Sequence, residues 1–342
     1  MRADAVAQDA PLVSVLLPVW NAAATLLACL RSLQRQRERR WECVLVDDGS
    51  CDASLAVARR VAAREPRLKV LATPHRGLVA ALQTGLNHCR GRFVARMDAD
   101  DLMHRERLAL QSQWLLSHPE LAAVGCHVRL FPRRFLRAGR RAYERWLNSI
   151  DSPQRVRQEA FVECPVAHPT LMVRREILLA FGYRDCGWPE DYDLLLRLLT
   201  SGLHVGMVPR RLLLWRDTPQ RLSRTSPTYA LSRFTACKAA FLAASFLAGR
   251  DTYILWGFGE TGKALHRALR AHGKRPAYIV ELHPRRLGKT IHGAAVIPPD
   301  ALPRVARLPL VVSVAGAAAR TEIRQALAQM GFVETRDFVC AA

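Results

Sequence analysis

Three carboxylates lie within four positions of the chain, at Asp98, Asp100 and Asp101, and are called the acidic cluster below. They follow directly on the apolar residues 93–95, which predict a buried strand. Side chains at the C-terminal ends of such strands line the crevice where α/β sheets bind ligands. Because crowded carboxylates repel one another, a bound cation would stabilise them, and Mg²⁺ or Mn²⁺ prefers such oxygen ligands. The alternative is an acidic cap on the helix predicted to follow.

Two further acidic pairs lie at the ends of predicted elements. Asp47 and Asp48 end the predicted strand 43–46, and Glu190 and Asp191 open a predicted helix. Carboxylates in these places suit binding and proton transfer. They also suit helix capping and the helix dipole, so a capping role stays open for Asp48 and Asp191.

Strands and helices alternate from residue 13 onward, which predicts an α/β fold with a largely parallel sheet. Strand 13–17 is expected to end at Pro18, and Asn21 is expected to cap the next helix. In a parallel sheet Pro18, Asp48 and the acidic cluster meet at one edge. The strands are predicted at 13–17, 43–46, 68–71 and 92–97, and less regular segments follow up to about residue 225.

The composition predicts a folded protein outside the secretory pathway. The 342 residues are 50% hydrophobic, which suffices for two domains. The nine cysteines form no C-x-x-C pair, which indicates a reducing compartment rather than disulfides or a zinc site. The first ten residues lack a signal sequence, and the longest apolar stretch, 239–248, has half the length of a membrane span. We therefore expect a cytoplasmic protein.

The formal charge is +21, and 46 of the 51 basic residues are arginine. Five arginines fall within residues 31–40 and seven within 129–145. Such clusters attract phosphates in an anionic membrane or an anionic substrate. Nucleic acid is disfavoured because no nucleic-acid-binding motif occurs. A solvated face without a partner is the alternative.

Four motifs in order give the chain a family resemblance: P-x-x-N at 18–21, V-D-D-G-S-x-D at 46–52, D-A-D-D at 98–101 and E-D-x-D-L-x-L-R at 190–197. Together they closely resemble the inverting family 2 glycosyltransferases of GT-A fold. The resemblance covers roughly residues 11–225 and implies a GT-A domain there.

The resemblance also implies roles for individual residues. Asp100 would hold the divalent cation, Mn²⁺ or Mg²⁺, on the donor diphosphate, and Asp98 would contact the ribose or the metal shell. Asp48 would accept a hydrogen bond from the donor base, and Asp191 would be the general base that deprotonates the acceptor hydroxyl. The donor nucleotide site would further include Pro18, Val19, Asn21 and Gly77, and His168 and Glu190 would lie near the acceptor or diphosphate.

The implied reaction moves a sugar from a nucleotide-sugar donor, a UDP-sugar first, to a glycan or lipid-diphosphate-linked acceptor. It would contribute to surface polysaccharide or lipopolysaccharide synthesis at the cytoplasmic face of the inner membrane. Gln83 stands where the family more often has Asn, which leaves the donor sugar open. His168 has the alternative of a hydrogen-bonded structural residue. A non-catalytic nucleotide-sugar-binding protein is the rival function.

The last 92 residues, 251–342, predict a second, smaller α/β domain after a helical linker at 226–250. Gly257, Gly259 and Gly262 form a G-x-G-x-x-G motif between a predicted strand and helix, and Glu281 ends the next strand. The domain looks like the small Rossmann-type domains that bind NAD or another nucleotide. A structural role is the alternative, and a bifunctional enzyme that modifies its donor with NAD is a further rival.

Overall fold

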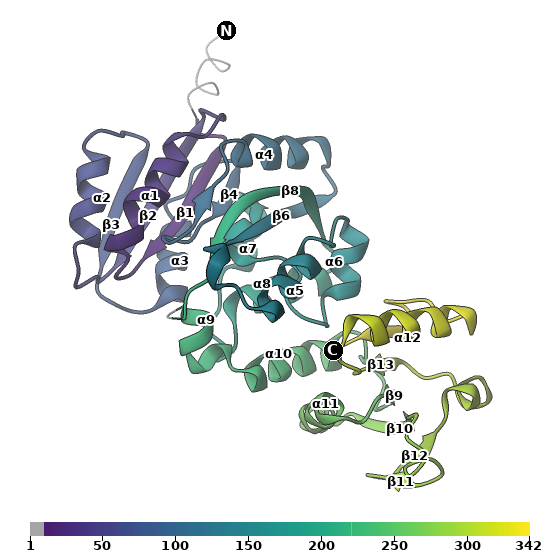
Figure 1. Cartoon of the computed structure of the whole chain (residues 1–342). Helices are drawn as coiled ribbons and strands as arrows, with labels where there is room; N and C mark the ends of the chain where they lie inside the picture. Colours follow the sequence, from purple (N-terminus) through teal and green to yellow (C-terminus); the bar gives the residue numbers. More distant parts are fainter. Residues whose placement is uncertain (1–9, 220) are drawn as a thin grey trace. The chain divides into compact units, whose positions relative to one another are not determined.

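The computed structural model describes residues 10–219 and 221–342 (Figure 1). These residues form two compact units. Unit 1 contains the described residues up to Val156 together with Val166–Cys186 and Arg197–Arg221. Unit 2 contains Arg157–Pro165, Gly187–Leu196 and Leu222–Ala342.

Unit 1 is built on an eight-stranded sheet with the order β3-β2-β1-β4-β7-β6-β8-β5. Strands β3, β2, β1 and β4 are parallel to one another, and β6 and β8 are parallel to each other. Short β7 and β5 pair antiparallel. The expected α/β class with a mostly parallel sheet is confirmed. The strands are β1 Val13–Val19, β2 Trp41–Asp48, β3 Leu68–Thr73, β4 Phe93–Arg96, β5 Leu102–Met103, β6 Leu121–Phe131, β7 Met172–Arg174 and β8 His204–Arg216.

Helices cover both faces of this sheet, because its central strands are apolar on both faces. Val15 and Leu17 of β1 pack in one core with Leu26 of the first helix. Leu16 faces the opposite side, where a Cβ at Gly85 would lie 2.4 Å from its Cδ1. The glycine therefore lets α3 approach the sheet closely. The helices of this part of the chain are α1 Ala23–Gln34, α2 Ser54–Ala62, α3 Leu78–Leu86, α4 Arg107–Ser117, α5 Ala138–Leu147, α6 Pro153–Glu159, α7 Arg175–Phe181 and α8 Glu190–Thr200.

A buried polar network ties the three central strands together. The Ser14 hydroxyl donates to Glu42 Oε1 at 2.6 Å and accepts from the backbone N–H groups of Arg90 and Gly91 at 3.0 and 2.8 Å. The Arg90 side chain donates to Glu42 Oε2 at 2.9 Å. Through these bonds β1, β2 and the start of β4 hold one register.

Two local predictions in this unit are wrong. Strand β1 continues through Pro18 to Val19, because β4 pairs with β1 only as far as Leu16 and no bond to β4 is lost at the proline. Asn21 does not cap α1, whose N-cap is Ala22. Its backbone is left-handed at φ 48°, and its Oδ1 accepts from Cys51 N at 2.9 Å.

Unit 2 contains a six-stranded sheet with the order β11-β12-β10-β9-β13-β14. Only β11 pairs antiparallel, and the order β12-β10-β9-β13-β14 is that of a doubly wound sheet. None of the helices in the described part of the chain has both the length and the apolar character needed to cross a membrane. The strands are β9 Thr252–Trp256, β10 Arg275–Val280, β11 Thr290–Ile291, β12 Ala294–Ile297, β13 Leu310–Val312 and β14 Phe338–Cys340, and the helices are α9 Leu222–Thr225, α10 Leu231–Ala244, α11 Glu260–Arg270 and α12 Ala317–Gln329.

Candidate active site

The acidic cluster follows strand β4, as predicted, and its ligand oxygens all lie within 4.8 Å of one another. The capping alternative is wrong, because β5 comes next and α4 begins only at Arg107, after an N-cap at Glu106. Capping the start of a helix therefore does not explain why these three carboxylates lie together.

Asp98 is paired with a buried arginine, the last residue of β4. Arg96 Nη2 lies 2.7 Å from Asp98 Oδ1, and the Arg96 side chain is only 3% exposed. Burial raises the pKa of Asp98, but the charges of Arg96, His168 and Arg221 outweigh it and hold the pKa below its usual range. Asp98 is therefore ionised across the neutral pH range.

The pKa values of Asp100 and Asp101 are shifted in the opposite direction, upward. Burial and the neighbouring Asp98 raise the pKa of Asp100 to about 6. Asp101 is fully buried, and burial together with Asp98 and Asp100 raises its pKa well above the ordinary value. Its Oδ1 accepts from the backbone N–H of Arg216 at 2.7 Å, whereas its buried Oδ2 has no hydrogen-bond partner among the described residues. An orphaned carboxylate oxygen beside two other carboxylates fits a divalent cation.

A buried arginine under the cluster fixes the end of β4. Arg107 is fully buried, donating from Nη2 to the backbone oxygen of Arg96 at 2.8 Å and from Nε to Gln111 at 2.9 Å. Gln111 in turn donates to the backbone oxygen of Thr170 at 2.8 Å. The site therefore rests on rigid elements, which favours a fixed ligand geometry.

Asp48 at the end of β2 holds two loops together. Its oxygens accept from the backbone N–H groups of Arg76 at 2.9 Å and Gly77 at 2.8 Å, and His75 Nδ1 lies 2.9 Å from Oδ2. Gly49, at φ +68°, permits this approach, since a Cβ there would lie 2.6 Å from His75 N. A carboxylate has about four acceptor positions, so one remains for the predicted bond to a donor base.

The segment after β1 lies against the same loops. The Trp20 ring is 52% exposed and stacks on His75 with 4.7 Å between ring centroids. Asn21 receives a bond from Cys51 and donates its N–H to Ser50 Oγ at 3.0 Å. Pro18 and Val19 precede this turn, so the predicted donor residues of the first two motifs are brought together.

His168 lies close enough to Asp98 to lower the pKa of that carboxyl, and its own ring is nearly buried. Its Nε2 lies 3.2 Å from the Tyr183 hydroxyl. His168 therefore forms the hydrogen bond expected of a structural residue and also lies beside the acidic cluster.

Glu190 and Asp191 open α8, as predicted, and residues 190–196 of that helix belong to unit 2. Glu190 Oε2 accepts from the Tyr229 hydroxyl at 2.6 Å. Asp191 Oδ1 accepts from the N–H of Tyr192 at 2.7 Å. The role of Asp191 as a base stays a prediction.

The model of the family described as glycosyl transferase family 2 matches residues 14–181. The amylovoran biosynthesis glycosyltransferase AmsE of Erwinia amylovora is 34% identical over 200 residues, which cover 57% of this chain and 73% of AmsE. The chain belongs to glycosyltransferase family 2. The putative glycosyltransferase EpsE of Bacillus subtilis is 29% identical over 238 residues, or 67% of this chain and 82% of EpsE.

Two solved structures share the fold of this family 2 chain. TarS 1–349 of S. aureus in complex with UDP-GlcNAc has a TM-score of 0.55 at 17% identity and covers 76% of this chain and 72% of that one. The mannosyltransferase PcManGT of Pyrobaculum calidifontis, in complex with GDP-Man and Mn²⁺, has a TM-score of 0.51 at 24% identity and covers 77% and 69%. The resemblance to family 2 glycosyltransferases is confirmed.

Sequence reasoning missed several residues that shape the site of this family 2 enzyme. His75 binds Asp48, Arg96 pairs with Asp98, and Arg216 bonds both Asp101 and the backbone oxygen of Asp100. Arg96 could have been noticed in the sequence, because it is a charged residue directly after the apolar run 93–95. No local signal marks Arg216, which is 115 positions from Asp101.

The glycine motif of unit 2 follows β9, with Gly257 and Gly259 before α11 and Gly262 inside the first turn of that helix. A Cβ at Gly257 would meet Val314 at 2.4 Å and one at Gly262 would meet the Gly257 carbonyl at 2.2 Å, whereas Gly259 has no neighbour within 4 Å. Glu281 does not stand free, because Arg286 Nη1 lies 3.3 Å from its Oε1 and donates to the Phe258 carbonyl at 3.0 Å.

Proposed function

We propose that this family 2 glycosyltransferase moves a sugar from a nucleotide-sugar donor to a hydroxyl of a glycan or lipid-diphosphate-linked acceptor, with inversion. The observation that carries the proposal is the buried, unpartnered Asp101 Oδ2 inside the acidic cluster. The names of relatives support the pathway: AmsE is an amylovoran biosynthesis enzyme, and the partly matching RfbC of Myxococcus xanthus is an O-antigen biosynthesis protein. RfbC is much longer, since the match covers 18% of it.

The acidic cluster would hold Mn²⁺ or Mg²⁺, with Asp100 as the principal ligand and Asp98 on the metal shell or ribose. PcManGT with Mn²⁺ supports the choice of a divalent cation. When bound, such a cation stabilises negative charge on a leaving nucleoside diphosphate. Arg96 keeps Asp98 ionised and so able to bind a cation. Arg216 donates to the backbone oxygen of Asp100 and so fixes the main chain that carries the proposed metal ligands.

The remaining residues of the proposed site position the two substrates. Asp48 would accept from the donor base, and Trp20 offers an exposed ring beside it. A UDP-sugar is the first candidate donor, supported by TarS with UDP-GlcNAc. Asp191 would take the proton from the acceptor hydroxyl as its oxygen attacks the anomeric carbon, and one displacement inverts that centre. We place the reaction at the cytoplasmic face of the inner membrane.

A donor screen tests the proposal. Hydrolysis of UDP-, GDP- and dTDP-sugars is measured with Mn²⁺ and with EDTA, for the wild type, Asp100→Ala and Asp191→Ala. We expect metal-dependent turnover of one donor that is lost in Asp100→Ala, while Asp191→Ala binds the donor without turnover. Metal-dependent donor binding without transfer to any acceptor extract would favour the non-catalytic binding protein. Absence of donor binding would overturn the proposal.

We also propose a nucleotide site in unit 2, with NAD or a nucleotide diphosphate as ligand. The open space at Gly259 supports it, since a pyrophosphate needs close approach to the helix N-terminus. Full-length chain with EDTA is titrated with NAD, because UDP would also bind the proposed donor site of unit 1. Gly259→Val should abolish NAD binding, and Ala271→Val, at an exposed position just after the other end of α11, should leave it unchanged. Equal affinity in both variants would favour the purely structural role.

A further inference from the structure

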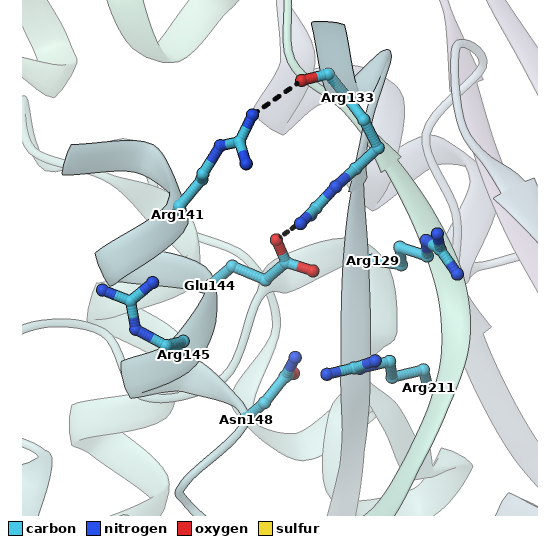
Figure 2. A pocket seen from close by; sticks show the side chains of 7 residues that line it. All are labelled: Arg129, Arg133, Arg141, Glu144, Arg145, Asn148 and Arg211. Carbon is cyan, nitrogen blue, oxygen red and sulfur yellow. Dashed lines mark hydrogen bonds and ion pairs between the residues drawn. The ribbon is translucent and has the colours of Figure 1, made fainter. Parts of the chain in front are cut away.

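Five arginines of unit 1, four from residues 129–145 and one from β8, surround one cavity of about 300 Å³. Figure 2 shows α5 side chains on one side of it and Arg129 of β6 and Arg211 of β8 on the other. The cavity is called the cationic pocket here, and its lining is Arg129, Arg133, Arg141, Glu144, Arg145, Asn148 and Arg211.

The charge of the lining is far from balanced. Five arginines and one glutamate give 5 − 1 = +4. Arg133 pairs with Glu144, and Arg141 donates to the backbone oxygens of Leu136 and Arg133 at 3.2 and 3.4 Å (Figure 2). Within the described residues, no carboxylate forms a salt bridge with any of the other three guanidinium groups. Like charges gathered around one hollow repel, so an anion bound there would stabilise the arrangement.

The walls of the pocket are held by rigid elements. Asn148, directly after α5, accepts from Val128 N and donates to Val128 O, both at 2.9 Å, which anchors that end of the helix to β6. Near the other end, Arg140 Nε lies 3.2 Å from Asp217 Oδ1. Glu144 is buried at 6% exposure, and its ion pair with Arg133 holds that guanidinium group in place. The guanidinium groups are therefore presented by a fixed scaffold.

We propose that the cationic pocket binds a phosphate-type oxyanion, a phosphate or diphosphate group. Planar guanidinium groups match phosphate oxygens in pairs, and a dianion or trianion offsets a lining of +4 better than a single carboxylate does. Arg211 and Arg216 lie on one strand, about 16 Å apart if fully extended. The pocket is thus separate from the acidic cluster but near enough for one long substrate to contact both.

Binding of inorganic pyrophosphate to the full chain tests this inference without any turnover, so its outcome is independent of the transferase proposal. Calorimetric titration is made in EDTA at low salt. The double variant Arg129→Ser, Arg211→Ser should bind at least tenfold more weakly. The matched control Arg59→Ser, Arg60→Ser removes the same charge from exposed positions of α2 and should bind within twofold of the wild type. Equal affinity in all three proteins, or no binding by the wild type, would overturn the proposal.

Vesicles then distinguish the two sources of phosphate. Flotation compares phosphatidylcholine vesicles with vesicles that also contain phosphatidylglycerol. If the pocket variant loses vesicle binding and the control keeps it, the phosphate belongs to a lipid headgroup. If pyrophosphate affinity falls in the pocket variant while vesicle binding is unchanged, the phosphate belongs to a soluble or acceptor-borne group. Should the double variant fold poorly by circular dichroism, the exposed Arg145→Ser replaces it.

Discussion

Replacing Asp100 by asparagine should stabilise the metal-free chain and remove its response to Mn²⁺. Burial and the charge of Asp98 raise the pKa of Asp100 from 3.8 to about 6. A carboxyl with a raised pKa adds stability below pH 3.8, and that stability is lost as pH rises through 6. At pH 8 the ionised group therefore lowers the free energy of unfolding by up to about 3 kcal/mol.

Coulomb's law gives a similar magnitude. Two charges 4.8 Å apart, the limit within which the cluster's oxygens lie, repel by about 3 kcal/mol at an effective dielectric constant of ~20. Asp100 is partly exposed, so solvent screening reduces the value, and we expect a gain of about 1 to 3 kcal/mol in Asp100→Asn. Mn²⁺ at a hundred times its dissociation constant should add about 2.7 kcal/mol to the wild type and little to the variant.

The assay is urea unfolding followed by tryptophan fluorescence at pH 8, in EDTA and in Mn²⁺. Asp151→Asn, an exposed position of the same unit, is the control and should change neither curve. A wild type that is indifferent to Mn²⁺, or an Asp100→Asn chain that is less stable than the wild type in EDTA, would refute the reasoning from crowded carboxylates.

Three further predictions follow from buried charges. Arg96→Met should lower the free energy of unfolding by about 3 to 5 kcal/mol, measured in urea, because Asp98 loses its buried partner. Asp48→Asn should cost about 1 to 3 kcal/mol and weaken nucleotide binding at least tenfold in calorimetry, since one backbone donor, at Arg76 or Gly77, loses its acceptor. Burial lowers the pKa of Lys238 from 10.5 to about 8, so the unfolded chain binds more protons above pH 8 and stability rises there. From pH 7 to 9 the wild type should gain about 1 kcal/mol over Lys238→Met in urea unfolding.

Each of these has an outcome that contradicts it. Arg92→Met, an exposed arginine just before the same strand, is the control for the first and should be nearly neutral. Loss of stability in Asp48→Asn with unchanged nucleotide affinity would restrict Asp48 to holding its loops. A constant stability difference between wild type and Lys238→Met across this pH range would show that Lys238 does not release its proton.

The sequence predicted what local patterns encode. Apolar runs located β2, β4 and β9, and the motif spacing located the acidic cluster and the loop of Asp48. Residues that complete these sites come from distant segments and could not be read locally. Arg216 reaches Asp101 only because β8 returns to pair with β5, and Arg211 faces Arg145 only because α5 packs on β6. The predicted helix cap at Asn21 was wrong because its side chain accepts from the distant Cys51 amide instead of from an amide of α1.

The bonds of Ser14 have a consequence for synthesis and folding. They join residues 28 and 77 positions apart, so the central strands of unit 1 cannot complete their pairing until residue 91 has left the ribosome. Closing such loops is a slow, entropically unfavourable step. A nascent chain that stops before Arg90 leaves the Glu42 carboxylate without its main donors. Truncations within the first ninety residues should therefore yield chains that chaperones and proteases recognise as unfolded.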